Sequence, residues 1–79
     1  MYLNNEFGIV RFKIDDLIKA KGISKTKLSY HAELQRSQLN AYCENKVARI
    51  DLVVLGRLCT VLDCDISDIL EFVPPAQKE

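Results

Sequence analysis

The segment from Gln35 to Asn40 concentrates side chains that can form hydrogen bonds with the edges of DNA bases. Its outward-facing residues are amides, a hydroxyl and one forked guanidinium: Gln35, Arg36, Ser37, Gln38 and Asn40. Groups of this kind read bases in a major groove, and an arginine can contact O6 and N7 of one guanine together. We therefore predict base contacts from four of them: Gln35, Arg36, Ser37 and Asn40. The alternative for Arg36 is a solvated helix arginine or a phosphate contact.

The apolar residues around this set indicate two short helices joined by a tight turn. Small or apolar side chains recur at the inward positions of such a pair: Leu28, Ser29, Ala32, Leu34, Leu39 and Tyr42. Leu28 and Ala32 lie one turn apart on the first helix, whereas Leu34 fills the turn. This spacing is typical of a helix-turn-helix at about residues 24–45, with the helix over 36–44 entering the groove.

Basic and polar side chains around the two helices are the expected partners of DNA phosphates. We predict phosphate contacts from six residues: Lys25, Lys27, Gln38, Tyr42, Lys46 and Arg49. For each cation the alternative is an ordinary solvated surface residue. Tyr42 has two interpretations, because its ring belongs to the core of the motif and its hydroxyl can reach a phosphate.

The net charge of the chain is zero, but the charges are distributed unevenly. Residues 11–49 contain nine basic and four acidic side chains, whereas residues 50–79 contain two basic and six acidic ones. The cationic part is the part that carries the helix-turn-helix pattern. Because phosphate contacts supply much of the affinity for DNA, this asymmetry favours a small DNA-binding protein.

Length and composition restrict the class further. A chain of 79 residues forms one domain with a single small core. No apolar run approaches the roughly 18–20 residues of a membrane span. The first residues lack the pattern of a secretory signal, so we expect a cytoplasmic protein. Three cysteines, an odd number, argue against a disulfide framework.

The sequence shows no constellation for catalysis or for a bound metal. His31 and the three cysteines lack paired ligand spacing such as C-x-x-C, and no glycine-rich loop could hold a phosphate group. We expect no enzymatic activity, cofactor, metal or small-molecule substrate. A minor hypothesis is that oxidation of the Cys43 thiol, on the predicted recognition helix, alters binding.

Capping residues and apolar spacing predict the boundaries of the elements. We expect helices over about 14–21, 24–32, 36–45, 51–62 and 67–71. Gly22 and Asn45 suit the left-handed conformation that ends a helix, whereas Ser24 and Asp51 are N-caps. Ile9–Phe12 is a short strand or leads into the first helix. The expected organisation is a loose leader (1–8), one domain (9–74) and a disordered tail (75–79).

These features resemble the Cro and phage-repressor type of helix-turn-helix regulators, the Xre family, in a compact single-domain form. The matching stretches are 11–17, 22–24, Leu28, Leu34, Leu39, 49–52, 62–64 and 68–74. The resemblance implies an all-α, five-helix lambda-repressor-like domain whose third helix lies in the major groove of double-stranded DNA. It also implies homodimers that bind two-fold symmetric sites as repressors, and a short ribbon between the N-terminal run and residues 71–73.

Three residues depart from the pattern of that family. Lys25 stands where glutamine is frequent, Glu33 stands where the turn often has glycine, and Glu44 places a carboxylate near the end of the recognition helix. With the zero net charge, Glu33 and Glu44 motivate a second hypothesis, a protein-interaction module (an antitoxin-like protein or an adaptor) that keeps the fold without binding a groove. The apolar segment 66–73 is the expected dimer surface, or else it completes the monomer core.

Overall fold

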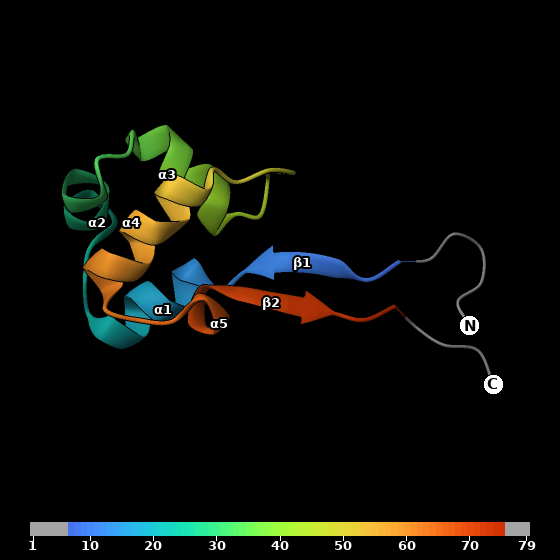
Figure 1. Cartoon of the computed structure of the whole chain (residues 1–79). Coiled ribbons are helices and arrows are strands. Elements are labelled where there is room, and N and C mark those ends of the chain that lie inside the picture. Colours follow the sequence, from blue (N-terminus) through green and yellow to red (C-terminus); the bar gives the residue numbers. More distant parts are fainter. Residues whose placement is uncertain (1–6, 76–79) are drawn as a thin grey trace.

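The computed structural model describes residues 7–75, in which a helical head carries a projecting two-stranded ribbon (Figure 1). Residues 1–6 of the expected leader and 76–79 of the expected tail lie outside the described residues. Within the described range, no helix is long and apolar enough to cross a membrane.

The head consists of the five helices predicted from the sequence: α1 (Ile14–Lys21), α2 (Lys25–Ala32), α3 (Arg36–Cys43), α4 (Leu52–Leu62) and α5 (Ile66–Ile69). Its core combines residues from every helix and from the base of the ribbon: Phe12, Ile14, Ile18, Leu28, Ala32, Leu39, Tyr42, Val54, Leu55, Leu58, Leu62 and Ile69. The predicted inward positions Leu28, Ala32 and Leu39 are all fully buried. Burial of these apolar groups is the main force that holds the short helices together.

The predicted helix caps are confirmed. The Ser24 hydroxyl accepts the backbone N–H of Lys27 at 3.0 Å, and the Asp51 carboxylate accepts that of Val53 at 2.7 Å. Gly22 has a φ of 69° and Asn45 a φ of 58°, both in the left-handed region. The caps therefore fix the start of α2 and of α4, and the chain turns at the two residues predicted to allow it.

The ribbon joins the two ends of the domain. β1 (Ile9–Phe12) pairs antiparallel with β2 (Leu70–Val73), with Ile9 opposite Val73 and Phe12 opposite Leu70. Ile9–Phe12 is thus a strand, which decides between the two interpretations of that run. Across the strands, Arg11 donates to the Glu71 carboxylate at 2.7 Å.

The prediction of a last helix over 67–71 is wrong at both ends. The helix begins at Ile66 and ends at Ile69, and Leu70 is extended at φ −114° and ψ 144°. The physical reason is competition for the backbone: pairing with Phe12 and Arg11 takes Leu70 and Glu71 into the ribbon. Local helical spacing does not reveal such a distant partner.

A side-chain amide fastens the ribbon to the head. The backbone N–H of Phe12 donates to Asn45 Oδ1 at 2.6 Å, and Asn45 Nδ2 donates to the carbonyl of Phe12 at 3.2 Å. Asn45 follows the end of α3, so this amide connects the predicted recognition helix to β1.

Candidate nucleic-acid interface

The turn between α2 and α3 sets the angle at which α3 leaves the head. Glu33 closes α2 with a φ of 58° and a ψ of 46°. Its N–H donates to the carbonyl of Tyr30 at 3.3 Å, and that of Leu34 donates to Ser29 at 2.9 Å. The left-handed conformation costs a residue with a side chain about 1–2 kcal/mol. The half-buried Leu34 packs against the core beside this turn.

One side of α3 is buried and the other is open. Leu39 is fully buried and Tyr42 is 4% exposed. The residues at the start of the helix are exposed (Gln35, Arg36, Ser37 and Gln38), and Asn40 is half-buried. In Figure 1, α3 lies at the upper margin of the head, on the side away from α1 and α5. The four predicted base-contacting residues therefore share the first two turns of a surface helix.

Arg36 is held in place between α2 and α3. Its Nη1 donates to the Thr26 hydroxyl at 2.7 Å, and its Nε donates to Asn40 Oδ1 at 3.4 Å. The remaining guanidinium donors and the amide nitrogen of Asn40 are left for a ligand. A guanidinium fixed in this way can present a planar fork to an acceptor pair such as guanine O6 and N7.

Gln38 and Tyr42 form a second side-chain pair along α3. Gln38 Nε2 donates to the Tyr42 hydroxyl oxygen at 3.2 Å. The Tyr42 ring packs against Phe12, with ring centroids 5.2 Å apart. Tyr42 is therefore a core residue, and its hydroxyl is directed along the helix toward Gln38.

The predicted phosphate-binding cations differ in their surroundings. Lys25 lies 3.6 Å from Asp15 Oδ1, and Lys19 lies 3.2 Å from Asp15 Oδ2. The hydrogen bond from Lys19, with smaller contributions from both lysine charges, lowers the pKa of Asp15. Lys27 and Arg49 are exposed and have no ion pair among residues 7–75. Among the predicted phosphate-binding cations, these two are the most readily available to an anionic ligand.

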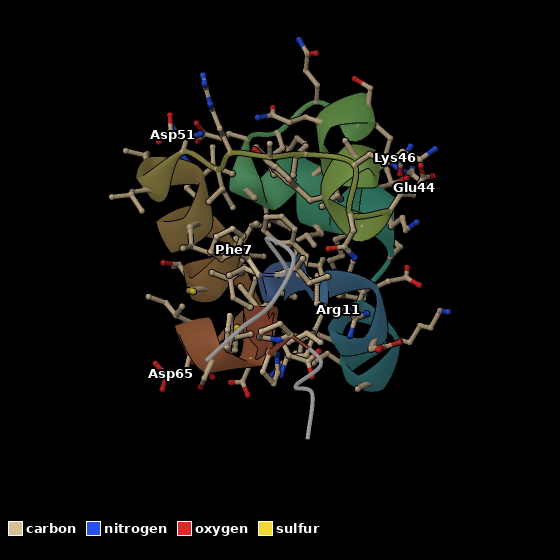
Figure 2. All side chains as sticks on the ribbon, turned by 90° about the vertical axis from the view of Figure 1, so that its right-hand side faces the viewer. Phe7, Arg11, Glu44, Lys46, Asp51 and Asp65 are labelled. Carbon is tan, nitrogen blue, oxygen red and sulfur yellow. The ribbon has the colours of Figure 1, made fainter. Side chains whose placement is uncertain are left out.

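Glu44 and Lys46 neutralise each other at the end of α3. Lys46 Nζ lies 3.3 Å from Glu44 Oε1, and both side chains are more than half exposed. Figure 2, which looks along the ribbon toward the head, shows the two side chains together beside α3. The carboxylate that departs from the family pattern is thus balanced locally, and Lys46 is less available to a phosphate.

Cys43 is half-buried at the end of α3, and burial raises the pKa of its thiol. A raised pKa reduces the thiolate fraction, which gives the thiol low reactivity toward oxidants. In the part of the chain that the structure describes, no group of three or more histidine, cysteine or acidic side chains could hold a metal ion.

Sequence reasoning missed two side-chain contacts that organise this surface. Thr26 holds Arg36 through its hydroxyl, and the Asn45 amide holds Phe12. Thr26 is exposed in the first turn of α2, where no apolar period marks it. A β-branched hydroxyl residue ten positions before an arginine carries no recognisable signal until the angle between the helices is known.

A family model described as the Cro/C1-type HTH DNA-binding domain matches residues 13–75. The chain belongs to this family. The match confirms the resemblance drawn from the sequence and makes the chain a DNA-binding domain of the type found in transcriptional regulators, a family that is not normally enzymatic. No curated protein matches it.

Solved structures share the fold of this Cro/C1-type domain. The match to a protein from Bacteroides fragilis spans 80% of this chain and 100% of that protein's chain, with 16% sequence identity and a TM-score of 0.72. The match to the transcriptional regulator VanUg spans 94% of this chain and 97% of the VanUg chain, with 24% sequence identity and a TM-score of 0.70. The match to the biofilm regulator SinR, solved in complex with DNA, spans 68% of this chain and 86% of the SinR chain, with 26% sequence identity and a TM-score of 0.64.

Proposed function

We propose that this Cro/C1-type domain is a sequence-specific repressor that inserts α3 into the major groove of double-stranded DNA. The observation that carries the proposal is the exposed start of α3, on which Arg36 is already held by Thr26 and Asn40. The solved SinR–DNA complex, from a chain 26% identical to this one, supports the same use of the fold. Because its ligand is genomic DNA, we place the protein in the cytoplasm.

The proposed roles follow the exposure of each side chain. Gln35, Arg36, Ser37 and Asn40 read base edges. Lys27 and Arg49 bind phosphates directly, and Lys25 and Lys46 join them when their carboxylate partners are displaced. Gln38 and Tyr42 act together at a phosphate, because the Gln38 amide retains one free N–H after its bond to the tyrosine.

Repression requires two copies of the domain. One short helix in one groove contacts too few base pairs for strong discrimination, whereas a two-fold pair reads two half-sites. We propose that the homodimer occupies an operator and excludes the transcription machinery. The folding unit of each copy is residues 9–74.

A second candidate is an adaptor that keeps the fold and binds a protein instead of DNA. The observation that favours it is that two of the four predicted phosphate-binding cations, Lys25 and Lys46, are paired with carboxylates. A SinR–SinI protein complex provides a structural neighbour of 25% identity that covers 70% of this chain over 53% of its own.

Selection of bound fragments from a random duplex pool distinguishes the two candidates. The selected fragment is then tested by fluorescence anisotropy at two salt concentrations. The repressor should bind it and weaken steeply with salt, because each phosphate contact contributes a slope of about −0.9 in log–log form. Failure to retain any fragment even at low salt would leave only the adaptor.

A further inference from the structure

The ribbon exposes large apolar side chains that the head does not cover. The exposed fractions are 78% for Phe7, 60% for Ile9, 64% for Val10 and 64% for Phe72. Figure 1 shows the ribbon projecting from the helices, and Figure 2 shows Phe7 at its near end. A sheet of only two short strands is marginally stable in water. Within residues 7–75 the sheet contains β1 and β2 alone, so both strands are edges.

The backbone groups that point outward from β1 follow from the Asn45 contacts. The N–H and the carbonyl of Phe12 both form hydrogen bonds with the Asn45 side chain, so these groups point away from β2. The next residue fits the alternation, because the N–H of Lys13 donates across the ribbon to Ile69 at 2.7 Å. Antiparallel pairs alternate in this way, so Val10 also directs its N–H and carbonyl groups outward. The same alternation, continued to the residue just before β1, gives Gly8 this orientation.

The two edges are not equivalent. On β2 the outward positions are Leu70, Phe72 and Pro74. The N–H of Leu70 donates to the carbonyl of Ile66, the first residue of α5, and Pro74 has no N–H to donate. Proline and occupied donors protect an edge strand from further pairing. β1 has no such protection at Gly8 and Val10, which makes it the open edge.

We infer that β1 pairs antiparallel with β1 of a second copy, with Gly8 opposite Val10 of that copy, to form a four-stranded sheet across a two-fold axis. This inference rests on the proposed function, for which it supplies the dimer interface. The register uses all the outward groups of Gly8 and Val10 in both copies and gives four hydrogen bonds between the copies. A second copy is the natural occupant because the pattern is complementary to itself.

The side chains fit the same register. Ile9 lies on the axis and meets Ile9 of the second copy as a pair without backbone hydrogen bonds, the closer kind of antiparallel pair. Phe7 lies opposite Arg11 of the second copy, where the guanidinium can stack on the ring. The Phe72 ring covers Gly8, since a Cβ built there would lie 2.5 Å from a ring atom. Gly8 thus lets this ring reach Val10 of the second copy.

The exposed apolar area sets the upper limit for the size of such a dimer interface. With about 150–250 Å² for each aromatic side chain, the exposed parts of Phe7, Ile9, Val10 and Phe72 offer roughly 500 Å² per copy. Two copies therefore offer at most about 1,000 Å², because edge pairing leaves part of both sheet faces in solvent, and this is the small end for a specific interface. An interface of this size fits a reversible dimer that a two-half-site operator stabilises.

Cysteine cross-linking tests the register directly. Ile9→Cys should form a covalent dimer under mild oxidation, because the two Cα atoms in such a pair lie about 4.5 Å apart. Mass spectrometry should find the peptide linked through position 9 of both copies, which separates this bond from links through native cysteines. Val73→Cys, which lies opposite Ile9 on the outer strand, is the matched control and should give no covalent link through position 73. Cross-linking of Val73→Cys but not Ile9→Cys would overturn the proposal.

A backbone substitution tests the hydrogen bonds. Val10→Pro removes an N–H that points away from β2, so the ribbon within each copy keeps its ladder. Sedimentation velocity should show dimerisation weakened roughly 10- to 100-fold, the loss of two hydrogen bonds per dimer. Val10→Thr keeps the N–H and the shape and should dimerise within about threefold of the parent. Unchanged dimerisation of Val10→Pro, with an unchanged circular dichroism spectrum, would exclude the β1 interface.

DNA binding separates the failure of this inference from the failure of the proposed function. Val10→Pro should bind a single half-site like the parent and lose affinity only for the two-half-site fragment. If the Ile9→Cys variant cross-links but the parent protein binds no DNA, the interface is correct and the repressor function is wrong. If the parent binds DNA and Val10→Pro binds the two-half-site fragment equally well, the interface is wrong and the function remains.

Discussion

The guanidinium of Arg36 donates to the Thr26 hydroxyl at 2.7 Å and so connects the first turn of α3 to the first turn of α2. The carboxamide of Asn40, one turn further along α3, accepts a second and longer bond from the same guanidinium at 3.4 Å. The arginine is therefore oriented by two neighbours before a ligand is present. Such preorganisation reduces the side-chain ordering that binding would otherwise require.

Arg36→Ala should weaken binding to the selected DNA fragment by a factor of roughly 10 to 100, the usual discrimination of one bidentate base contact. Binding to random duplex should change much less, because phosphate contacts dominate there. Anisotropy titrations on both duplexes at one salt concentration measure the difference. Arg36→Lys provides the matched control, since it keeps the charge but not the fork. Equal losses on the two duplexes would show that Arg36 contacts only phosphate.

Thr26→Val should reduce affinity for the selected fragment several-fold by releasing the Arg36 guanidinium. The substitution replaces the hydroxyl with a methyl group of similar shape on an exposed residue, so the free energy of unfolding should change by less than about 0.5 kcal/mol. Thr26→Ser retains the hydroxyl and should bind like the parent. If Thr26→Val also binds like the parent, the contact with Thr26 does not position Arg36 for DNA.

The sequence predicts the helical head well because its evidence is local. Ser24 and Asp51 cap helices within three residues of themselves, and Gly22 and Asn45 turn the chain where the apolar spacing stops. Each of these predictions depends on neighbouring residues, and each is confirmed. The inward positions of α2 and α3 follow from the same short-range periodicity.

The ribbon and the fine structure of the candidate site depend on distant partners. Leu70 has helical neighbours on one side but is extended, because Phe12 pairs with it from the other end of the chain. Thr26 and Asp15 each determine the state of a cation from another helix. No local pattern encodes such pairs, so the sequence indicates which cations exist but not which are available to a phosphate.

Asp15→Asn should strengthen binding to random duplex at low salt by freeing Lys25 and Lys19. The slope of log affinity against log salt should become steeper by up to about 0.9 for each released lysine that gains a phosphate contact. Asp16→Asn, an exposed neighbour outside the ion pairs described, controls for the change in net charge. Equal effects of the two substitutions would mean that Lys25 is not restrained by Asp15.

The same carboxylate defines a pH dependence. Lys19 and Lys25 lower the pKa of Asp15 below its ordinary value of 3.8, so the ion pairs persist above that value. Their contribution to stability is fully present well above 3.8 and is lost as the pH falls from about that value through the lowered pKa. Asp15→Asn should therefore remove a part of the acid sensitivity of folding, measured as the change in urea midpoint between pH 6 and pH 3. If the urea midpoint changes equally between pH 6 and pH 3 in the parent and in Asp15→Asn, Asp15 does not have this role.

Glu33→Gly should stabilise the domain by about 0.5–1 kcal/mol. The left-handed conformation at φ 58° costs a residue with a side chain about 1–2 kcal/mol. Glycine avoids this cost, but its greater conformational freedom in the unfolded chain offsets part of the gain in stability. Thermal unfolding should show a midpoint raised by roughly 2–8 °C. Glu33→Ala removes the carboxylate but keeps the Cβ, so it should not be stabilised. If alanine stabilises as much as glycine, charge rather than backbone strain is the cause.

Asn45→Ala should destabilise the domain by about 2–3 kcal/mol. It removes two hydrogen bonds to the backbone of Phe12, each worth about 0.5–1.5 kcal/mol, and leaves a Cβ residue at a φ of 58°. Urea unfolding monitored by circular dichroism measures this loss. Asn45→Gly relaxes the backbone but still lacks the amide, so its loss should be smaller, about 1–2 kcal/mol. A glycine variant as stable as the parent would show that the amide bonds to Phe12 contribute no more than the backbone strain that glycine relieves.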